Sequence, residues 1–233
     1  MVLAGMPVLR SARPWKLRFI DMRSEREIRG DFLDALQAEA DNDLGRLGFK
    51  RRIHSLRFSR SGSDVIHGVT FIADFFPRYQ IGAEAHIHPM MSVEMPAVSR
   101  RALELVGGDR MLLANAPEVI INQPVEFAAP KDKRVRWFAA GRGEFDERVR
   151  AIVAFLRSWT IPLLDELTTP ESLVDAYERQ EERLIRQRHW YLFVAAAFEL
   201  TGSPGQARQV LEDQLGTPGL RKRYAAAFQR SRL

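Results

Sequence analysis

Residues 56–88 read LRFSRSGSDVIHGVTFIADFFPRYQIGAEAHIH, and this stretch decides the fold class. Apolar and polar residues alternate in three parts of it, at 56–59, 65–76 and 83–88, which is the pattern of half-buried strands. The connections between these parts are short. Because parallel strands need a crossover of about a dozen residues or more, the short connections predict three antiparallel strands in a meander.

The alternation also predicts two different faces for this sheet, because side chains two residues apart in a strand point the same way. One face carries aliphatic and aromatic side chains and belongs to the core. The other face carries ionisable side chains and meets solvent. The apolar face is predicted to hold Phe58, Val69, Phe71, Ala73 and Phe75, and the ionic face Arg57, Glu84, His86 and His88.

A helix is predicted before the sheet. Ser24 and Glu27 have the spacing of a capping box, and apolar residues recur every three or four positions from Ile28 to Leu47. Gly48 is well placed to end this helix. Later patterns predict a helix at 98–106, an extended segment at 118–127, and a strand at 134–139 with Val135 and Trp137 on one side and Arg134 and Arg136 on the other.

From residue 141 onward the sequence is typical of helices. An amphipathic pattern begins at Phe145, and we expect this helix to stop before Pro162. Thr169-Pro170 is a start signal for a helix that runs toward Arg188. In that helix Glu182 and Arg186 would have the i,i+4 spacing of a surface ion pair. Further helices are predicted at 190–201, after Ser203-Pro204 and after Thr217-Pro218.

These elements predict an α+β fold, with an antiparallel β-sheet packed by an N-terminal helix and followed by a helical C-terminal segment. The predicted division is a loose arm at 1–23, in which 16–20 could form one strand, an α+β domain at 24–160, and a helical segment at 161–233 that packs on it. The alternative is that the last two form one domain.

Composition places the chain among globular proteins. It has 233 residues, 45% of them hydrophobic and 28% charged. There is no cysteine, so disulfides, thiolate metal sites and cysteine nucleophiles are excluded. The longest apolar run is far shorter than the ~20 residues needed to cross a bilayer. The first residues lack the basic start of a secretory signal, and we therefore expect a soluble, cytoplasmic protein.

The net charge of +5 is concentrated at the two ends of the chain. Residues 217–233, for example, carry five basic and no acidic side chains. This distribution favours solvated faces and a basic tail over one basic working face, which a nucleic-acid binder would need. A nucleic-acid site would draw on a basic run interleaved with aromatic residues, but the period of two sends Phe58 to the face opposite Arg57. The residues of that run are Lys50, Arg51, Arg52, Arg57 and Arg60, beside Phe49, Phe58 and Tyr79.

A metal site is the clearest chemical hypothesis. Glu84, His86 and His88 alternate along one predicted strand, so all three would project together. Two imidazoles and a carboxylate are suitable ligands for zinc or iron. The same alternation is typical of an ordinary solvent-facing sheet. The residues that could complete such a site are His54, His67 or Asp74.

Other chemistry has weaker support. Asp74 lies in an apolar run, where it could be a buried acid with a raised pKa or a hydrogen-bonded residue near a strand end. The charged run around Glu181 and Glu182 is interpreted as a solvated helix face. No P-loop, dinucleotide fingerprint or nucleophile elbow occurs in the sequence, so no cofactor is expected.

One resemblance to a known family can be stated. Residues 44–51, LGRLGFKR, close a helix and enter a strand that carries arginine and phenylalanine. With the predicted meander and the helical C-terminus, residues 25–180 resemble the bacterial family called Domain of Unknown Function 4304. That family has no established catalytic residues to carry over. Small cytoplasmic α+β proteins of this kind also resemble immunity proteins that neutralise bacterial toxins, an analogy that rests on fold class.

The sequence thus favours a non-catalytic protein-binding protein, in particular an immunity protein that occludes a bacterial toxin with an acidic surface. The expected contact residues are Arg57, Glu84, His86, His88 and Arg136. The alternatives are a metal-dependent hydrolase that uses Glu84, His86 and His88, and a nucleic-acid-binding protein. No membrane association is expected.

Overall fold

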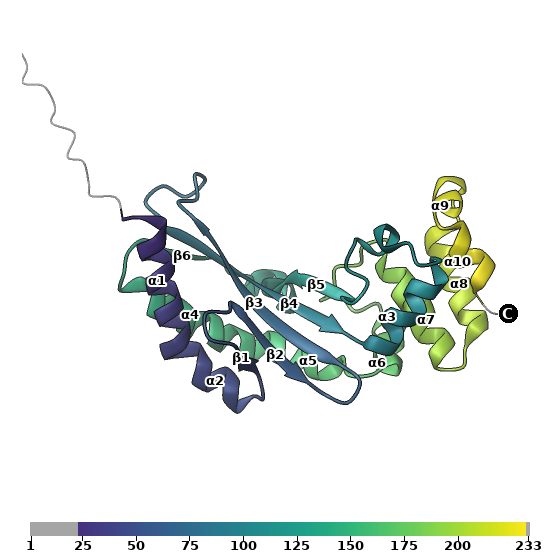
Figure 1. The fold of residues 1–233 in the computed structure, drawn as a ribbon, viewed down its shortest axis with the longest axis horizontal. Helices are drawn as coiled ribbons and strands as arrows, with labels where there is room; N and C mark the ends of the chain where they lie inside the picture. Colours follow the sequence, from purple (N-terminus) through teal and green to yellow (C-terminus); the bar gives the residue numbers. More distant parts are fainter. Residues whose placement is uncertain (1–22, 232–233) are drawn as a thin grey trace, which may run out of the picture.

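The structure is a computed structural model, and it describes residues 23–231. An antiparallel β-sheet carries helices over one face, and further helices gather at one end of the sheet (Figure 1). This arrangement confirms the α+β class, the N-terminal helix and the helical C-terminus. The predicted arm, apart from Arg23, and its strand at 16–20 lie outside the described residues.

The sheet is antiparallel at every pairing. The order is β1-β2-β3-β4-β5, and β6 also pairs with β4. The central hairpin of β3 and β4 confirms the predicted meander, although β4 continues to Glu94. The strands are β1 Lys50–Arg51, β2 Arg57–Ser61, β3 Ile66–Phe75, β4 Ala85–Glu94, β5 Ile121–Pro124 and β6 Trp137–Ala139.

Pro89 is accommodated inside β4 by a gap in the neighbouring ladder. Phe71 is its partner in β3, and the amide of Phe71 donates to the carbonyl of Leu56 on the other side. In an antiparallel ladder the amide position of Pro89 must then face away from β3. On that side β5 ends opposite Met90 and β6 begins opposite Ile87, so the proline lies between the two pairings and no ladder bond is lost there.

A pair of long helices covers the apolar face of the sheet. The first joins α1 (Glu25–Ala35), a π turn (Leu36–Ala40) and α2 (Asp41–Arg46). The predicted capping box is present, with the Glu27 amide donating to Ser24 Oγ. Gly48, at φ +83°, follows the end of this helix. The second joins α4 (Glu144–Phe155), a π turn (Leu156–Thr160) and α5 (Ile161–Glu166).

The expectation that the second helix stops before Pro162 is wrong. The π turn makes Ile161 donate to Leu156, five residues back, which widens the helix just before the proline. A proline normally clashes with the carbonyl four residues earlier, and the wider turn relieves that contact. The predicted boundary at residue 160 therefore falls inside a continuous helix.

The helices at the end of the sheet pack around α7. This helix is buried on nearly every side, from Leu192 to Phe198. α3 follows β4 directly and packs against α7, as do α6 and α8. α3 and the starts of α7, α8 and α9 were all predicted. The bounds are α3 Pro96–Leu105, α6 Pro170–Glu178, α7 Trp190–Leu200, α8 Pro204–Leu215, α9 Pro218–Arg223 and α10 Ala225–Arg230.

Two further predictions need correction. α6 ends at Glu178 rather than near Arg188, so the expected ion pair between Glu182 and Arg186 has no helix to support it. Arg186 instead donates to the backbone carbonyl of Glu181. β6 is shorter than predicted, since it begins only at Trp137. Val135 lies before the strand and is exposed, whereas Trp137 is buried, so the two do not share one side as predicted.

Candidate functional site

Among residues 23–231, no helix covers one face of the sheet, and we call this the open face. Along β4 every second residue is buried, and the residues between them, such as His86 and His88, remain partly exposed. In Figure 1, α4 and α5 lie behind the sheet. The register places further residues of β2, β3 and β6 beside these histidines. The open face comprises Arg57, Thr70, Ile72, Asp74, His86, His88, Met90 and Phe138.

Three of the five predicted contact residues, Arg57, His86 and His88, lie on the open face. Arg57 is ion-paired with Glu94 across the sheet. Its side chain passes over Gly68, where a Cβ atom would lie 3.3 Å from Arg57 Nε and 2.3 Å from Ser92 Oγ. A side chain at that position would therefore displace Ser92 Oγ or the guanidinium of Arg57.

The other two predicted residues lie beside strands. Arg136 is exposed just before β6. Glu84 comes just before β4, and its carboxylate accepts a hydrogen bond of 2.8 Å from Arg23 Nη1. Glu84 is thus held by a cation.

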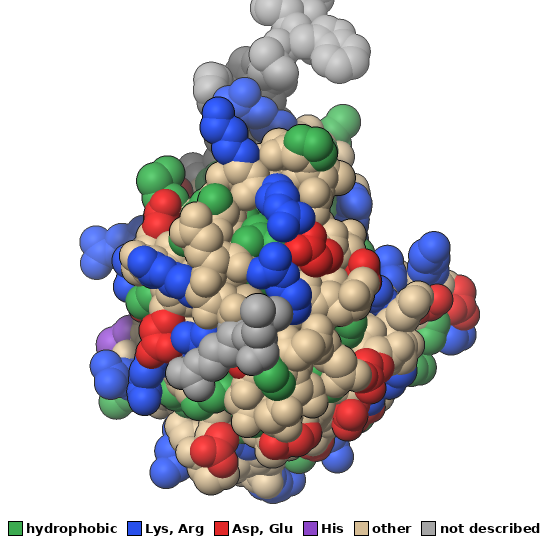
Figure 2. Space-filling model, turned by 90° about the vertical axis from the view of Figure 1, so that its right-hand side faces the viewer, with side chains coloured by type: hydrophobic (Ala, Val, Ile, Leu, Met, Phe, Trp, Pro, Cys, Tyr) green, Lys and Arg blue, Asp and Glu red, His purple; other side chains and the backbone are tan. Residues whose placement is uncertain are grey.

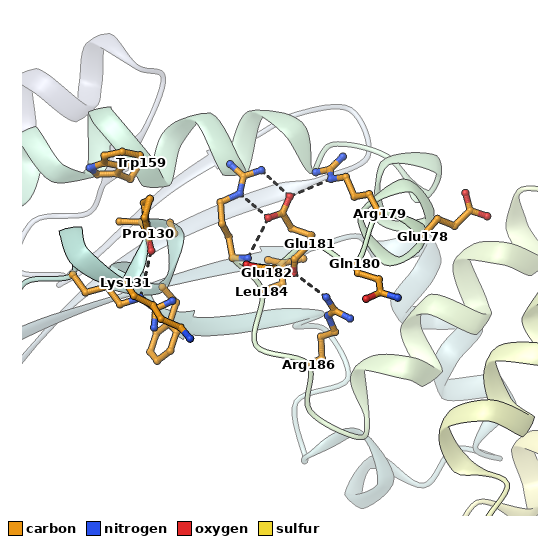
Figure 3. A pocket seen from close by; sticks show the side chains of 15 residues that line it. Pro130, Lys131, Trp159, Glu178, Arg179, Gln180, Glu181, Glu182, Leu184 and Arg186 are labelled. Carbon is orange, nitrogen blue, oxygen red and sulfur yellow. Dashed lines mark hydrogen bonds and ion pairs between the residues drawn. The ribbon is translucent and has the colours of Figure 1, made fainter.

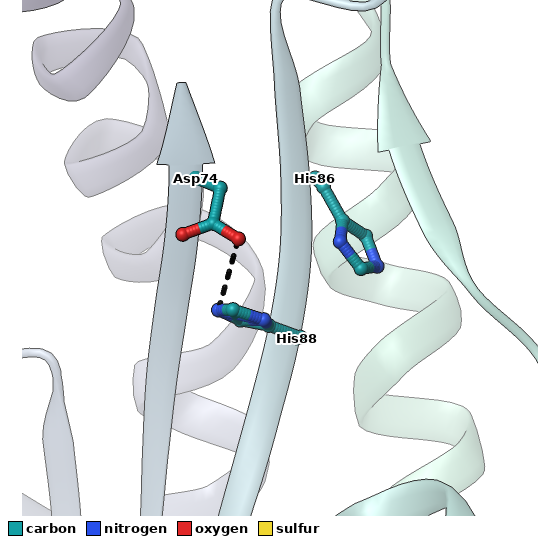
Figure 4. Close-up of side chains that lie close together, drawn as sticks. All are labelled: Asp74, His86 and His88. Atoms are coloured by element: carbon teal, nitrogen blue, oxygen red, sulfur yellow. Dashed lines mark ion pairs between the residues drawn. The ribbon is translucent and has the colours of Figure 1, made fainter. Parts of the chain in front are cut away.

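Asp74, His86 and His88 form a cluster whose ligand atoms all lie within 4.8 Å of one another (Figure 4). Asp74 is the direct cross-strand partner of His86, and His88 follows two residues later on the same face. His88 Nε2 lies 3.8 Å from Asp74 Oδ2. The side chain of Asp74 is 54% exposed, which excludes the alternative that it is a buried acid, and it lies near the end of β3.

Neighbouring aromatic side chains hold the ring of His86. Phe138 stacks on it at 4.5 Å and 20°, and the Tyr79 hydroxyl lies 2.7 Å from Nδ1. Burial lowers the pKa of His86 below its ordinary value, and the charges of His88 and Arg136 lower it further, against the opposing effect of Asp74. The imidazole is therefore neutral at neutral pH, which leaves a nitrogen lone pair for bonding.

His88 presents an unusual buried atom. Its Nε2 is shielded from solvent and has no hydrogen-bond partner within residues 23–231. An unsatisfied buried polar atom costs about 1–3 kcal/mol, and such atoms are rare in native proteins. The atom is directed toward Asp74, at a distance too long for a hydrogen bond.

The other residues expected to complete a metal site lie elsewhere. His67 is buried on the opposite face, between the carbonyl of Leu167 and the guanidinium of Arg60. His54 is exposed in the turn between β1 and β2, with φ +63°. The carboxylate that meets the two histidines comes from Asp74, because antiparallel register sets it opposite His86, while Glu84 turns to Arg23.

Sequence reasoning missed a large pocket of about 1420 Å³ (Figure 3). It lies between Trp159, the segment 127–134 and the segment 178–186. Three of its charged side chains are ion-paired, since Glu181 binds Arg179 and Arg183, and hydrogen bonding from Arg183 lowers the pKa of Glu181 to about 2. The only signal was the charged run 178–188, which resembles a solvated helix.

The predicted nucleic-acid surface is divided, because Lys50, Arg52 and Arg57 are exposed while its two phenylalanines are not. Phe49 and Phe58 are buried in the core. Arg51 is held by Asp41 at 2.6 and 2.7 Å, and Arg60 is ion-paired with Asp165. On the face formed by the C-terminal helices, basic side chains are mixed with acidic ones (Figure 2). These pairings do not favour a site that collects phosphates.

Comparison of the chain with protein-family models, with curated proteins and with solved structures finds no match. Within residues 23–231, no helix combines the length and apolar character that a membrane span requires.

Proposed function

We propose that this protein is a non-catalytic binding protein that engages a folded protein partner through the open face and the adjoining loop of the β3–β4 hairpin. The observation that carries the proposal is a group of exposed apolar side chains on the β3–β4 hairpin. Single exposed apolar residues are common, but several together on one surface mark interaction sites. This hairpin patch comprises Ile72, Phe76, Tyr79 and Ile81, which are 38%, 41%, 61% and 98% exposed.

The surroundings of the hairpin patch suit a partner with acidic residues. Arg78 and Arg136 are both exposed beside it. An apolar centre with a charged rim is the usual composition of a protein interface, and complementary charge speeds association and restricts the choice of partner. The specific role we propose is that of an immunity protein, which would occlude the working surface of a bacterial toxin.

The test is to identify and then measure the partner. The immobilised protein captures a partner that is identified by mass spectrometry, purified, and titrated against wild type and variants. We expect Ile81→Asp and Tyr79→Ala each to weaken binding about tenfold or more. The matched control is Ile53→Asp, since Ile53 is also strongly exposed but lies outside the hairpin patch.

The outcomes separate the general proposal from the specific one. If Ile53→Asp weakens binding as much as Ile81→Asp, or if neither hairpin variant weakens it, the hairpin patch is not the interface and the proposal fails. If the partner arrests growth of a bacterial host, co-expressed wild-type protein should restore growth and Ile81→Asp should not. A partner without toxicity would retain the binding role and exclude the immunity role.

A metal-dependent hydrolase is the alternative. The cluster of Asp74, His86 and His88 favours it, because these side chains are suitable metal ligands. A hydrolase also needs a group that activates water. Glu84, the nearest carboxylate in the sequence, is engaged with Arg23. The geometry therefore supports the binding role better.

A further inference from the structure

The two histidines and the aspartate of the open face are brought together by strand register alone. Asp74 and His86 are direct partners in adjacent antiparallel strands, where Cβ atoms lie about 5 Å apart. His88 points to the same face from two residues along β4. The site is therefore built on the two longest strands of the sheet, and its backbone is held by ladder hydrogen bonds on both sides of β4.

The spacing of the ligand atoms is close to that of a coordination sphere. Ligand atoms lie about 2.0–2.2 Å from zinc, so two of them are separated by at most about 4 Å. The three ligand atoms lie within 4.8 Å of one another, so a small side-chain movement would bring them to the separation that a bound ion requires. Asp74 can make that movement because its side chain is more than half exposed, whereas Phe138 and Tyr79 hold His86 in place.

The His88 nitrogen that lacks a hydrogen bond is a second observation, since its contact with Asp74 (dashed in Figure 4) is an ion pair only when the imidazole is protonated. It is buried, directed toward Asp74, and satisfied by no hydrogen bond within the described part of the chain. A cation between the imidazole and the carboxylate would satisfy this atom and would also compensate the charge of Asp74. A direct hydrogen bond from His88 to Asp74 would also satisfy the nitrogen, but it would require a shorter distance than the observed 3.8 Å.

The chemistry of the three groups selects the kind of ion. Imidazole nitrogen suits zinc, copper, nickel, cobalt and iron, whereas magnesium and calcium prefer oxygen ligands. Three protein ligands leave at least one coordination position for water or for an incoming group. We infer that Asp74, His86 and His88 bind one divalent transition-metal ion of the zinc type, with its remaining position directed to solvent on the open face. This inference goes beyond the proposed binding role, which requires no metal.

The experiment is a titration of the chelator-treated protein with zinc, in which isothermal titration calorimetry measures the stoichiometry and the affinity. We expect one ion per chain in the wild type. His86→Ala, His88→Ala and the isosteric Asp74→Asn should each lower the affinity at least about tenfold, since even changes around a metal's ligands cost about 10–100-fold. Cobalt in place of zinc should give a visible absorption spectrum that these variants lose, and magnesium should not bind.

The matched control is His54→Ala, which removes an exposed histidine outside the cluster. We expect its zinc affinity to equal that of the wild type, and circular dichroism of each variant confirms that it is folded. The inference is overturned if the wild type binds no zinc at millimolar concentration, or if His54→Ala loses as much affinity as His88→Ala. Neither result depends on whether a protein partner is found.

Discussion

At the residue scale, His67 shows how partners fix a protonation state. It is buried, with Nε2 2.9 Å from the carbonyl oxygen of Leu167 and Nδ1 3.0 Å from Arg60 Nη2. A carbonyl can only accept and a guanidinium can only donate, so the neutral tautomer with hydrogen on Nε2 satisfies both. A second proton on Nδ1 would face the guanidinium. Burial is the main reason that the pKa of His67 is lowered.

We therefore expect His67 to make the protein less stable in mild acid. Because its pKa is lowered in the folded state, the unfolded chain takes up the proton first as pH falls below about 6.5. The contribution to stability is fully present above pH 6.5 and is lost as pH falls through the folded pKa. Urea unfolding at pH 7.5 and 5.5 measures the effect.

The control for this prediction is His67→Gln, whose amide can donate to the same carbonyl but does not titrate. The wild type should lose more unfolding free energy between the two pH values than the variant does. If the two proteins lose equal amounts, His67 is not the group responsible, and the other histidines with lowered pKa values, His86 and His189, would carry the dependence.

At the scale of elements, α7 carries the packing of the helical end. It contacts α3, α6 and α8, and residues 192–198 are all buried. A helix that is apolar on every side is stable only when other elements enclose it. The apolar pattern therefore predicted a helix at 190–201. It did not predict which elements enclose that helix, because one of them, α3, lies about ninety residues earlier in the chain.

We expect Phe193→Ala to destabilise the protein by about 3–5 kcal/mol, because truncating a fully buried phenylalanine removes its transfer free energy and leaves a cavity. The matched control is Leu200→Ala in the same helix, where the side chain is exposed and the loss should stay below about 1 kcal/mol. Chemical denaturation of both variants measures the difference. Equal losses would contradict the packing described for α7.

The segment after α6 shows where a local sequence pattern predicts the wrong structure. The charged run after α6 has helical spacing, yet the chain leaves the helix at Glu178 and Gln180 has φ +54°. Gln123 explains part of this course, because its buried amide donates to the carbonyl of Arg183 and accepts from the amide of Ile185. Such a contact between β5 and a distant segment satisfies backbone groups that a helix would have satisfied internally.

At the scale of the whole molecule, the sheet and the helical end share one core. The buried apolar residues within 23–231 belong to one cluster. β4 leads directly into α3, which packs on α7, and Gln123 ties β5 to the segment before α7. Although the molecule is elongated in Figure 1, these connections join its two ends.

We therefore expect one cooperative thermal transition in calorimetry, with equal calorimetric and van't Hoff enthalpies. Gln123→Leu should shift the whole transition down by several degrees, because it leaves two backbone groups unpaired at a cost of about 2 kcal/mol. Asn122→Leu changes the exposed neighbour and should shift it little. Two separate transitions would show that the sheet and the helical end unfold independently.

The sequence by itself determined the features that depend on near neighbours in the chain. The capping box at Ser24, the alternating strands of 56–88 and the proline starts of α8 and α9 all follow from local backbone preferences and periodicity. The same alternation placed His86 and His88 on one face.

Tertiary structure alone decided which groups those histidines meet. Asp74 rather than Glu84 joins them because cross-strand register, set by hydrogen bonds between β3 and β4, determines neighbours across a sheet. The helix through Pro162, the early end of α6 and the pocket beside Glu181 likewise depend on contacts between segments far apart in sequence. Local periodicity carries no information about such contacts, because they form only when the whole core assembles.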